Sequence, residues 1–336
     1  MSDRTLDCFN ESLRNEILRL RAEGKTDSEI TENLTDEKIH NALSALINDM
    51  SVNVVKNIEN TMFERVFEER AKAAAFMAHN EQIWFKGFVT SEAMYLMVIE
   101  AAEEYCSIVS EFSDKKRAEK EYRFMALQGI HGRACQQYLE ILCLLKNGFA
   151  DGAYARWRSL YELTVVADFI SKNDEAVAKA FIIQSNTDEK WPDWAKAAPV
   201  FANKKGHIKF SDIEKNCSFF NDTWKDEHDL SCKLIHASPQ GTFSRICNIR
   251  DTSNVVPTGH CDGGLALPAV NAASLLSIVS AFFFNIFATG DGTVIINALR
   301  EWVNVIDRTY LKIEEDCFPQ GEDHPDPVAE KADTEV

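Results

Sequence analysis

A run of 28 residues without a charged side chain, from Gly263 to Gly290, leaves this chain two main ways to fold. Such a segment either forms the buried central helix of a bundle or crosses a bilayer. Asn271, Ser277 and Asn285 interrupt the run, and no Lys or Arg flanks either end closely. We therefore expect a core helix and no association with a membrane.

The composition favours helices. The chain has 336 residues but only 14 Gly and 8 Pro, the residues that tight turns between strands require. Its 45% hydrophobic residues can fill one large core or two smaller ones. We expect an all-α protein with a multi-helix bundle over residues 51–313, built on a long antiparallel helix hairpin. A small helical unit over residues 1–50 is expected to precede it.

Acidic side chains dominate the carboxyl-terminal segment 314–336, where nine Asp and Glu residues accompany a single Lys. An acidic stretch that also contains proline is predicted to form a disordered tail. Nine acids less one base supply eight of the 17 net negative charges of the chain, so the body is only moderately acidic. The total charge argues against a protein that coats nucleic acid, but a local site for RNA stays open.

The first fifty residues resemble the helix-turn-helix pattern of bacterial regulators over 24–34. Thr26 and Glu29 have the spacing of a capping box at a helix start. The acidic Asp36 and Glu37 would face DNA at the start of the recognition helix, where phosphates and base acceptors repel carboxylates. The pattern therefore predicts a structural helical unit and no DNA binding.

Two long helices are predicted in the middle of the chain. The first starts near Asp114 and ends at Asn147 and Gly148, and the second runs from Asp151 through Phe169. Long helices joined by a few residues form an antiparallel hairpin. Upstream, the aromatic run 83–88 is predicted to interrupt a helix and to mark a junction.

The amino terminus lacks the apolar stretch of a secretory signal, and the nine cysteines include no C-x-x-C pair. This usage is typical of reduced thiols in a cytoplasm, which is the location we expect. Closely spaced zinc ligands are lacking, so neither a metal site nor a cofactor is predicted.

The strongest candidate for chemistry is the stretch 156–162 on the second helix of the hairpin. Arg158 and Glu162 are four residues apart, so they share one helix face and can pair. A charge on an apolar face is expensive unless it is paired, so Arg158 is either a structural clamp or a functional group. Arg156 and Tyr161 from the same stretch are predicted to contribute to binding.

Three histidines complete the candidate set. Ser231 is predicted to cap a short helix that ends near His236, where the helix dipole favours a protonated ring suited to a general acid. His236 is therefore assigned to catalysis. His228, and His131 within an apolar helix, are predicted binding residues, although a lone His on such a stripe is usually a hydrogen-bonded core residue.

Familiar catalytic motifs are absent. The sequence contains no P-loop, no G-x-G-x-x-G, no G-x-S-x-G and no H-E-x-x-H. These absences argue against P-loop nucleotide hydrolysis, nicotinamide redox chemistry, and serine-hydrolase or zincin chemistry.

Several spaced elements resemble a bacterial all-helical family of unknown function. They are an R-S-x-x-E helix, Arg158 to Glu162, and a downstream L-S-x(4)-H-x-S motif that contains Leu230 and His236. The likeness extends over about residues 80–310. The family label implies no activity.

A more distant resemblance is to HEPN domains, helical bundles that are often dimeric. It implies a metal-independent ribonuclease or toxin-type effector in phage defence, with RNA as substrate. Their motif places an Arg shortly before a His, a spacing that this chain lacks. The resemblance therefore requires Arg158 and His236 to meet across helices, with Glu162 orienting the Arg. The alternative is a non-catalytic scaffold or regulatory protein that acts through protein partners, and a homo-oligomer or a partner protein is expected in either case.

Overall fold

The computed structural model of the chain describes residues 4–187, 190–219, 222–236 and 258–318, with Pro239, Thr242 and Ile246 as isolated positions. Every regular element in these ranges is a helix, which confirms the predicted all-α class. The helices are α1 (Arg4–Ala22), α2 (Asp27–Asn33), α3 (Asp36–Ser110), α4 (Asp114–Ala118), α5 (Glu121–Lys146), α6 (Ala150–Lys172), α7 (Glu175–Gln184), η1 (Asp193–Ala197), η2 (Pro199–Phe201), α8 (Phe210–Glu214), α9 (Asp222–Ile235), α11 (Ala266–Phe284) and α12 (Gly290–Cys317).

The chain divides into two compact units, Met1–Ala73 and Ala74–Val336. In unit 1, the predicted capping box opens α2. The Thr26 Oγ1 accepts a hydrogen bond from the Glu29 N–H at 3.4 Å, and the Thr26 N–H donates to Glu29 Oε2 at 2.8 Å. Gly24, with a φ of +81°, follows the end of α1 as the sequence predicts for a helix stop.

The predicted interruption at 83–88 is wrong, because α3 continues through it to Ser110. Trp84 and Phe88 are four residues apart and fully buried, and the same face continues through Ser91 and Met94. Phe85 is exposed. The aromatic run therefore keeps the helical period of burial.

The α5–α6 hairpin is the centre of unit 2, and its turn forms where the sequence predicts. Gly148 has a φ of +72°. The Gly148 N–H donates to Leu145 O and the Phe149 N–H to Leu144 O, both at 2.9 Å, which is the bonding pattern of a Schellman motif. The glycine carbonyl accepts from the N–H of Cys261 at 3.0 Å, so the turn also anchors the segment before α11.

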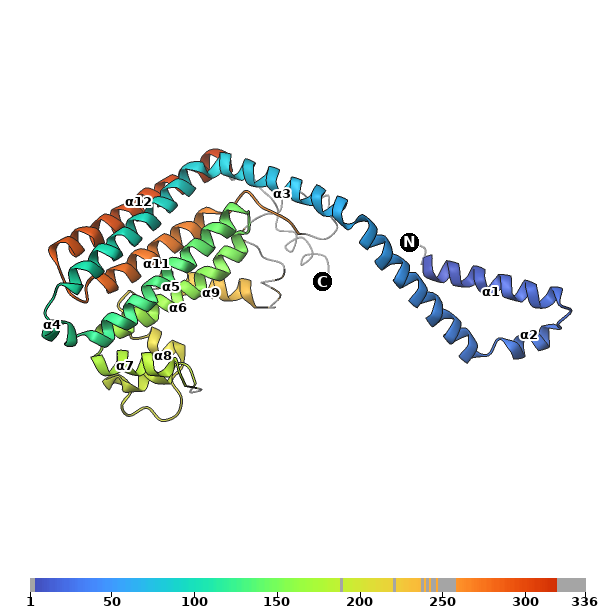
Figure 1. The fold of residues 1–336 in the computed structure, drawn as a ribbon, viewed down its shortest axis with the longest axis horizontal. Helices are drawn as coiled ribbons and strands as arrows, with labels where there is room; N and C mark the ends of the chain where they lie inside the picture. The colour runs from blue at the N-terminus through green and yellow to red at the C-terminus, as the bar shows by residue number, and fades with distance from the viewer. Residues whose placement is uncertain are drawn as a thin grey trace, which may run out of the picture. The chain divides into compact units, whose positions relative to one another are not determined.

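The uncharged run forms α11, which packs against α5, α6 and α12 (Figure 1). Within the described ranges, Ala266–Phe284 is the one helix long and apolar enough to cross a membrane by length and composition, and 61% of that window is buried inside unit 2. Its packing is that of a core helix.

The last helix of unit 2, α12, lies against α3. Tyr310 is fully buried and its hydroxyl shares a hydrogen bond with Ser91 of α3, while the Trp302 indole N–H donates to the carbonyl of Thr90. The helix runs on to Cys317, past the start of the predicted acidic tail. Residues 319–336, most of that tail, lie outside the described residues.

Candidate functional site

Arg158 and Glu162 form the ion pair that their spacing predicts. The Arg158 Nε lies 3.3 Å from Glu162 Oε1, one turn along α6. The two side chains keep 26% and 36% of their surface exposed, although the Arg158 Nε itself is buried. Core residues of α6, such as Leu160 and Val165, fix the rotation of this helix.

Helices α8 and α9 close over the neighbouring part of α6. The His228 ring of α9 stacks on the Tyr161 ring, with centroids 4.8 Å apart and planes 28° from parallel. The Tyr161 hydroxyl donates to Glu214 Oε1 of α8 at 2.9 Å, and His228 Nδ1 lies 3.9 Å from the same oxygen. Cys232, one turn after His228, places its Sγ 3.8 Å from His228 Nε2.

These six residues, Arg158, Tyr161, Glu162, Glu214, His228 and Cys232, are called the Arg158 cluster below. Burial is the main cause that lowers the pKa of His228 below 6.5, and the positive charge of Arg158 acts in the same direction. Glu214, Glu162 and Asp229 oppose this shift. The imidazole is therefore neutral at pH 7, the form that can accept a proton.

The Tyr161 hydroxyl and the Cys232 thiol of the cluster stay protonated at neutral pH. Burial, followed by the charge of Glu214, raises the pKa of Tyr161. Burial also raises the pKa of the Cys232 thiol, although Arg158 opposes the shift. Cys232 is thus a thiol and not an activated nucleophile at neutral pH.

Four of the seven predicted site residues come together in the cluster: Arg158, Tyr161, Glu162 and His228. His236 directly follows the end of α9, as predicted, and is exposed. Its backbone N–H bonds the carbonyl of Cys232 at 3.1 Å, and no side-chain bond from it to the cluster is seen within the described ranges. Its catalytic role stays a prediction.

The expected cap at Ser231 is wrong, because α9 begins nine residues earlier at Asp222. The Ser231 hydroxyl is buried and donates to the carbonyl of His228 at 2.7 Å, inside the helix. The longer helix places His228 and Cys232 one turn apart on one side of α9, and His236 follows directly after its last residue.

Arg156 and His131 have other partners. Arg156 is two residues before Arg158, about 200° around the helix, and it pairs with Glu140 of α5. His131 is buried between α5 and α11, where its Nε2 shares a hydrogen bond of 3.1 Å with Ser280 Oγ and its ring stacks on Phe283. Neither contacts the Arg158 cluster among the described residues.

Two members of the cluster were not predicted. Cys232 could have been found from its spacing of four residues after His228. Glu214 gives no comparable signal, since it ends a five-residue helix whose position depends on tertiary packing against α6. In the described ranges, no group of three or more His, Cys, Asp or Glu side chains could hold a metal ion.

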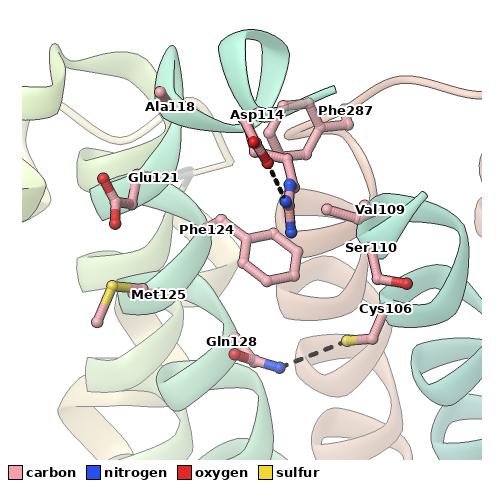
Figure 2. Close-up of a pocket in the computed structure, with 11 residues that line it drawn as sticks. Cys106, Val109, Ser110, Asp114, Ala118, Glu121, Phe124, Met125, Gln128 and Phe287 are labelled. Atoms are coloured by element: carbon pink, nitrogen blue, oxygen red, sulfur yellow. Dashed lines mark hydrogen bonds and ion pairs between the residues drawn. The ribbon is translucent and has the colours of Figure 1, made fainter. Parts of the chain in front are cut away.

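A cavity of about 550 Å³ lies elsewhere in unit 2, between the end of α3, α4 and the start of α5 (Figure 2). Figure 2 shows Phe124 lying between the polar groups of this cavity. Asp114 pairs with Arg117, and the Gln128 amide donates to Cys106 Sγ at 3.4 Å. None of the lining residues belongs to the Arg158 cluster.

Comparison with known proteins agrees with the predicted likeness to a family of unknown function. A family described as a family of unknown function (DUF5677) matches residues 124–230. The matched stretch contains α6, α8 and the part of α9 up to Leu230, and it ends before Cys232 and His236. No curated protein and no solved structure matches the chain. The more distant HEPN resemblance stays a prediction.

Proposed function

We propose that unit 2 is a metal-independent ribonuclease of the HEPN-like, toxin-type effector class, acting in phage defence through the Arg158 cluster. The observation that carries the proposal is geometric: His228 of α9 stacks on Tyr161 of α6, one helical turn from Arg158 of the Arg158–Glu162 pair on the same helix. The guanidinium of Arg158, which would bind a phosphate, and the neutral imidazole of His228 thus come from separate helices and lie in one partly exposed site.

The chemistry needs no metal. The neutral His228 takes the proton of an RNA 2′-hydroxyl, and the 2′ oxygen then bonds to phosphorus. The bond from phosphorus to the 5′ oxygen breaks, the leaving oxygen takes up a proton, and a 2′,3′-cyclic phosphate remains. Arg158 stabilises the negative charge of the phosphorane, and Glu162 holds the guanidinium in place. His236 is the proposed proton donor to the leaving oxygen.

The test is cleavage of a labelled single-stranded RNA by the full chain in EDTA. We expect Arg158→Ala and His228→Asn each to slow cleavage by about 10²-fold or more, the usual contribution of such groups. The exposed Arg133 and His79 are the matched controls, because Arg133→Ala and His79→Asn change residues of the same types away from the cluster.

The pH dependence supplies a second readout. Since the pKa of His228 lies below 6.5, the cleavage rate should rise with pH below that value as the imidazole loses its proton. In cells, overexpression should be toxic for the wild type and harmless for Arg158→Ala. Absence of RNA cleavage by the folded wild type over pH 5–8 contradicts the proposal.

A non-catalytic scaffold is the second candidate, and the charge of the site favours it. The charges that act on His228 are three carboxylates, Glu162, Glu214 and Asp229, and one guanidinium, Arg158, a balance that repels phosphate. In this case Arg158 has only a structural role, as the partner of Glu162 on α6. Arg158→Ala would then lower the free energy of unfolding, and RNA would be neither bound nor cleaved.

A further inference from the structure

Unit 1 has very little core of its own. Among its described residues only two apolar side chains, Leu20 and Ile30, are buried. A hollow of about 650 Å³ lies between α1, α2 and the start of α3. Its apolar lining residues are Phe9, Leu13, Leu20, Leu34, Ile39 and Ala42. Because short helices depend on tertiary packing for their stability, this unit is incomplete as a single copy.

The part of α3 that belongs to unit 1 exposes one continuous apolar side, called the α3 face below. Its residues are Val52, Val55, Ile58, Met62, Phe63, Val66 and Phe67, which recur at steps of three and four. All seven are exposed, including Phe63 at 67% and Phe67 at 61%. A row of large exposed apolar side chains on one helix marks an interaction surface.

The charges beside the α3 face favour a particular occupant. Residues 52–73 carry four acidic and four basic side chains, so this segment is neutral within a chain of net charge −17. Amphipathic helices that lie on membranes are rich in Lys and Arg on their polar side, which this segment is not. A neutral surface with both signs neither repels a second copy of itself nor attracts a strongly charged partner.

We propose that the α3 face is a homodimer interface, in which the α3 face of one chain packs against the same face of a second copy. A two-fold arrangement of this kind is self-complementary and buries the exposed aromatic rings of both chains. Unit 1 is then a dimerisation module whose core is completed by its partner.

The test is sedimentation equilibrium of the full chain over a range of concentrations. We expect a species of twice the chain mass of 38.0 kDa. Met62 lies in the middle of the α3 face, and Met62→Glu places a carboxylate there in both copies. Because two buried side chains are lost at once, the dimer Kd should rise by about 100-fold or more.

Two variants separate loss of the interface from loss of folding. Met62→Leu keeps the apolar surface and should remain dimeric, while Asn57→Glu adds the same charge on the polar side of α3 and should also remain dimeric. Helix content by circular dichroism should be equal in all three variants. A wild-type chain that stays monomeric at 100 µM, or that binds neutral lipid vesicles as a monomer, overturns the proposal, as does a Met62→Glu chain that dimerises normally.

Discussion

His131 is enclosed by α5 and α11, and its Nε2 shares a hydrogen bond with the hydroxyl of Ser280. Burial lowers the pKa of His131 to about 4, so the ring stays neutral in the folded protein at pH values where it is charged in the unfolded chain. The His131 side chain therefore lowers the free energy of unfolding in acid and has no such effect at neutral pH.

This gives a prediction for stability against pH. Between about pH 6.5 and pH 4 the unfolded state binds a proton at His131 that the folded state does not, so the free energy of unfolding falls as pH is lowered. A pKa difference of 2.5 units corresponds to about 3 kcal/mol. Urea titrations should show this loss in the wild type and a smaller one in His131→Asn. His79→Asn, at an exposed site, should follow the wild type.

Asp168 is another buried polar residue, and no sequence pattern predicts its role. Its side chain is fully buried on α6 and accepts hydrogen bonds from the Ser218 N–H at 2.6 Å and the Ser218 hydroxyl at 2.7 Å. Lys172, one turn later, pairs with it at 2.9 Å. The carboxylate thus fastens the segment after α8 to α6, beside the Arg158 cluster.

We expect Asp168→Asn to lower the free energy of unfolding by about 2–3 kcal/mol, because charge-assisted hydrogen bonds are weakened and Lys172 loses its partner. Asp174→Asn is a matched control, since the Asp174 side chain makes no capping bond to α7. Chemical denaturation of both variants measures the difference. Equal stability of the two would contradict the anchoring role of Asp168.

At this scale, the sequence could predict contacts made within one helix and not those made between helices. Arg158 and Glu162 pair because a spacing of four fixes their common face. The choice between His228 and His236 depended on where α9 begins, and the Ser231 pattern misplaced that start. Glu214 and Asp168 act through tertiary neighbours, for which no local pattern exists.

The hairpin turn provides the clearest prediction at the scale of elements. A Cβ on Gly148 would lie 2.6 Å from the Phe76 ring and 2.7 Å from the carbonyl oxygen of Cys261, and the φ of +72° already disfavours a side chain. Gly148→Ala should therefore lower the free energy of unfolding by about 2 kcal/mol or more.

The matched control lies four residues away. Gly152 is inside α6, and a Cβ there would meet its nearest neighbours at an ordinary 3.7 Å. Gly152→Ala should raise the free energy of unfolding by about 0.5–1 kcal/mol through helix propensity. Opposite signs for the two substitutions in urea titrations are the expected result. A destabilised Gly152→Ala with an unaffected Gly148→Ala would refute this account of the turn.

Several helix ends were predictable because they carry local signals, but the predicted start of a long helix near Asp114 was wrong, since the short α4 ends at Ala118 and α5 begins at Glu121. Gly24, Gly148 and the Thr26 capping box lie where the sequence expects them. The false interruption at 83–88 arose because aromatic density was taken as a break, although Trp84 and Phe88 keep the spacing of a buried helix face. The length of α9 was underestimated, because Ser231 has a second use as a donor within the helix.

At the scale of the whole molecule, the two units differ sharply in how much apolar surface they bury. Unit 2 contains nearly all buried apolar residues of the described chain, while unit 1 contributes Leu20 and Ile30. The free energy needed to open a helix locally, which sets the exchange rate of its amides, rises with the number of its buried contacts. In hydrogen exchange at neutral pH, amides of α1 and α2 should therefore exchange within seconds to minutes, long before those of α5, α6 and α11.

This expectation concerns α1 and α2 only, since dimerisation would protect the α3 face separately. Mass-spectrometric peptides from 4–33 report on it, and peptides from α11 serve as the internal reference. Protection of α1 as strong as that of α11 would contradict the contrast in burial.

The bond from Cys261 to the carbonyl of Gly148 joins parts of the chain that are made at different times. The His260 Nδ1 likewise forms a hydrogen bond with the carbonyl of Asn147, 113 residues earlier in the chain. Ribosomes add about 5–20 residues per second, so the hairpin turn leaves the exit tunnel roughly 6–23 s before these two bonds can form. During that interval the nascent α5 and α6 lack α11, and their apolar sides face solvent or a chaperone. Synthesis rate over residues 149–261 therefore governs how long the growing polypeptide is exposed to aggregation.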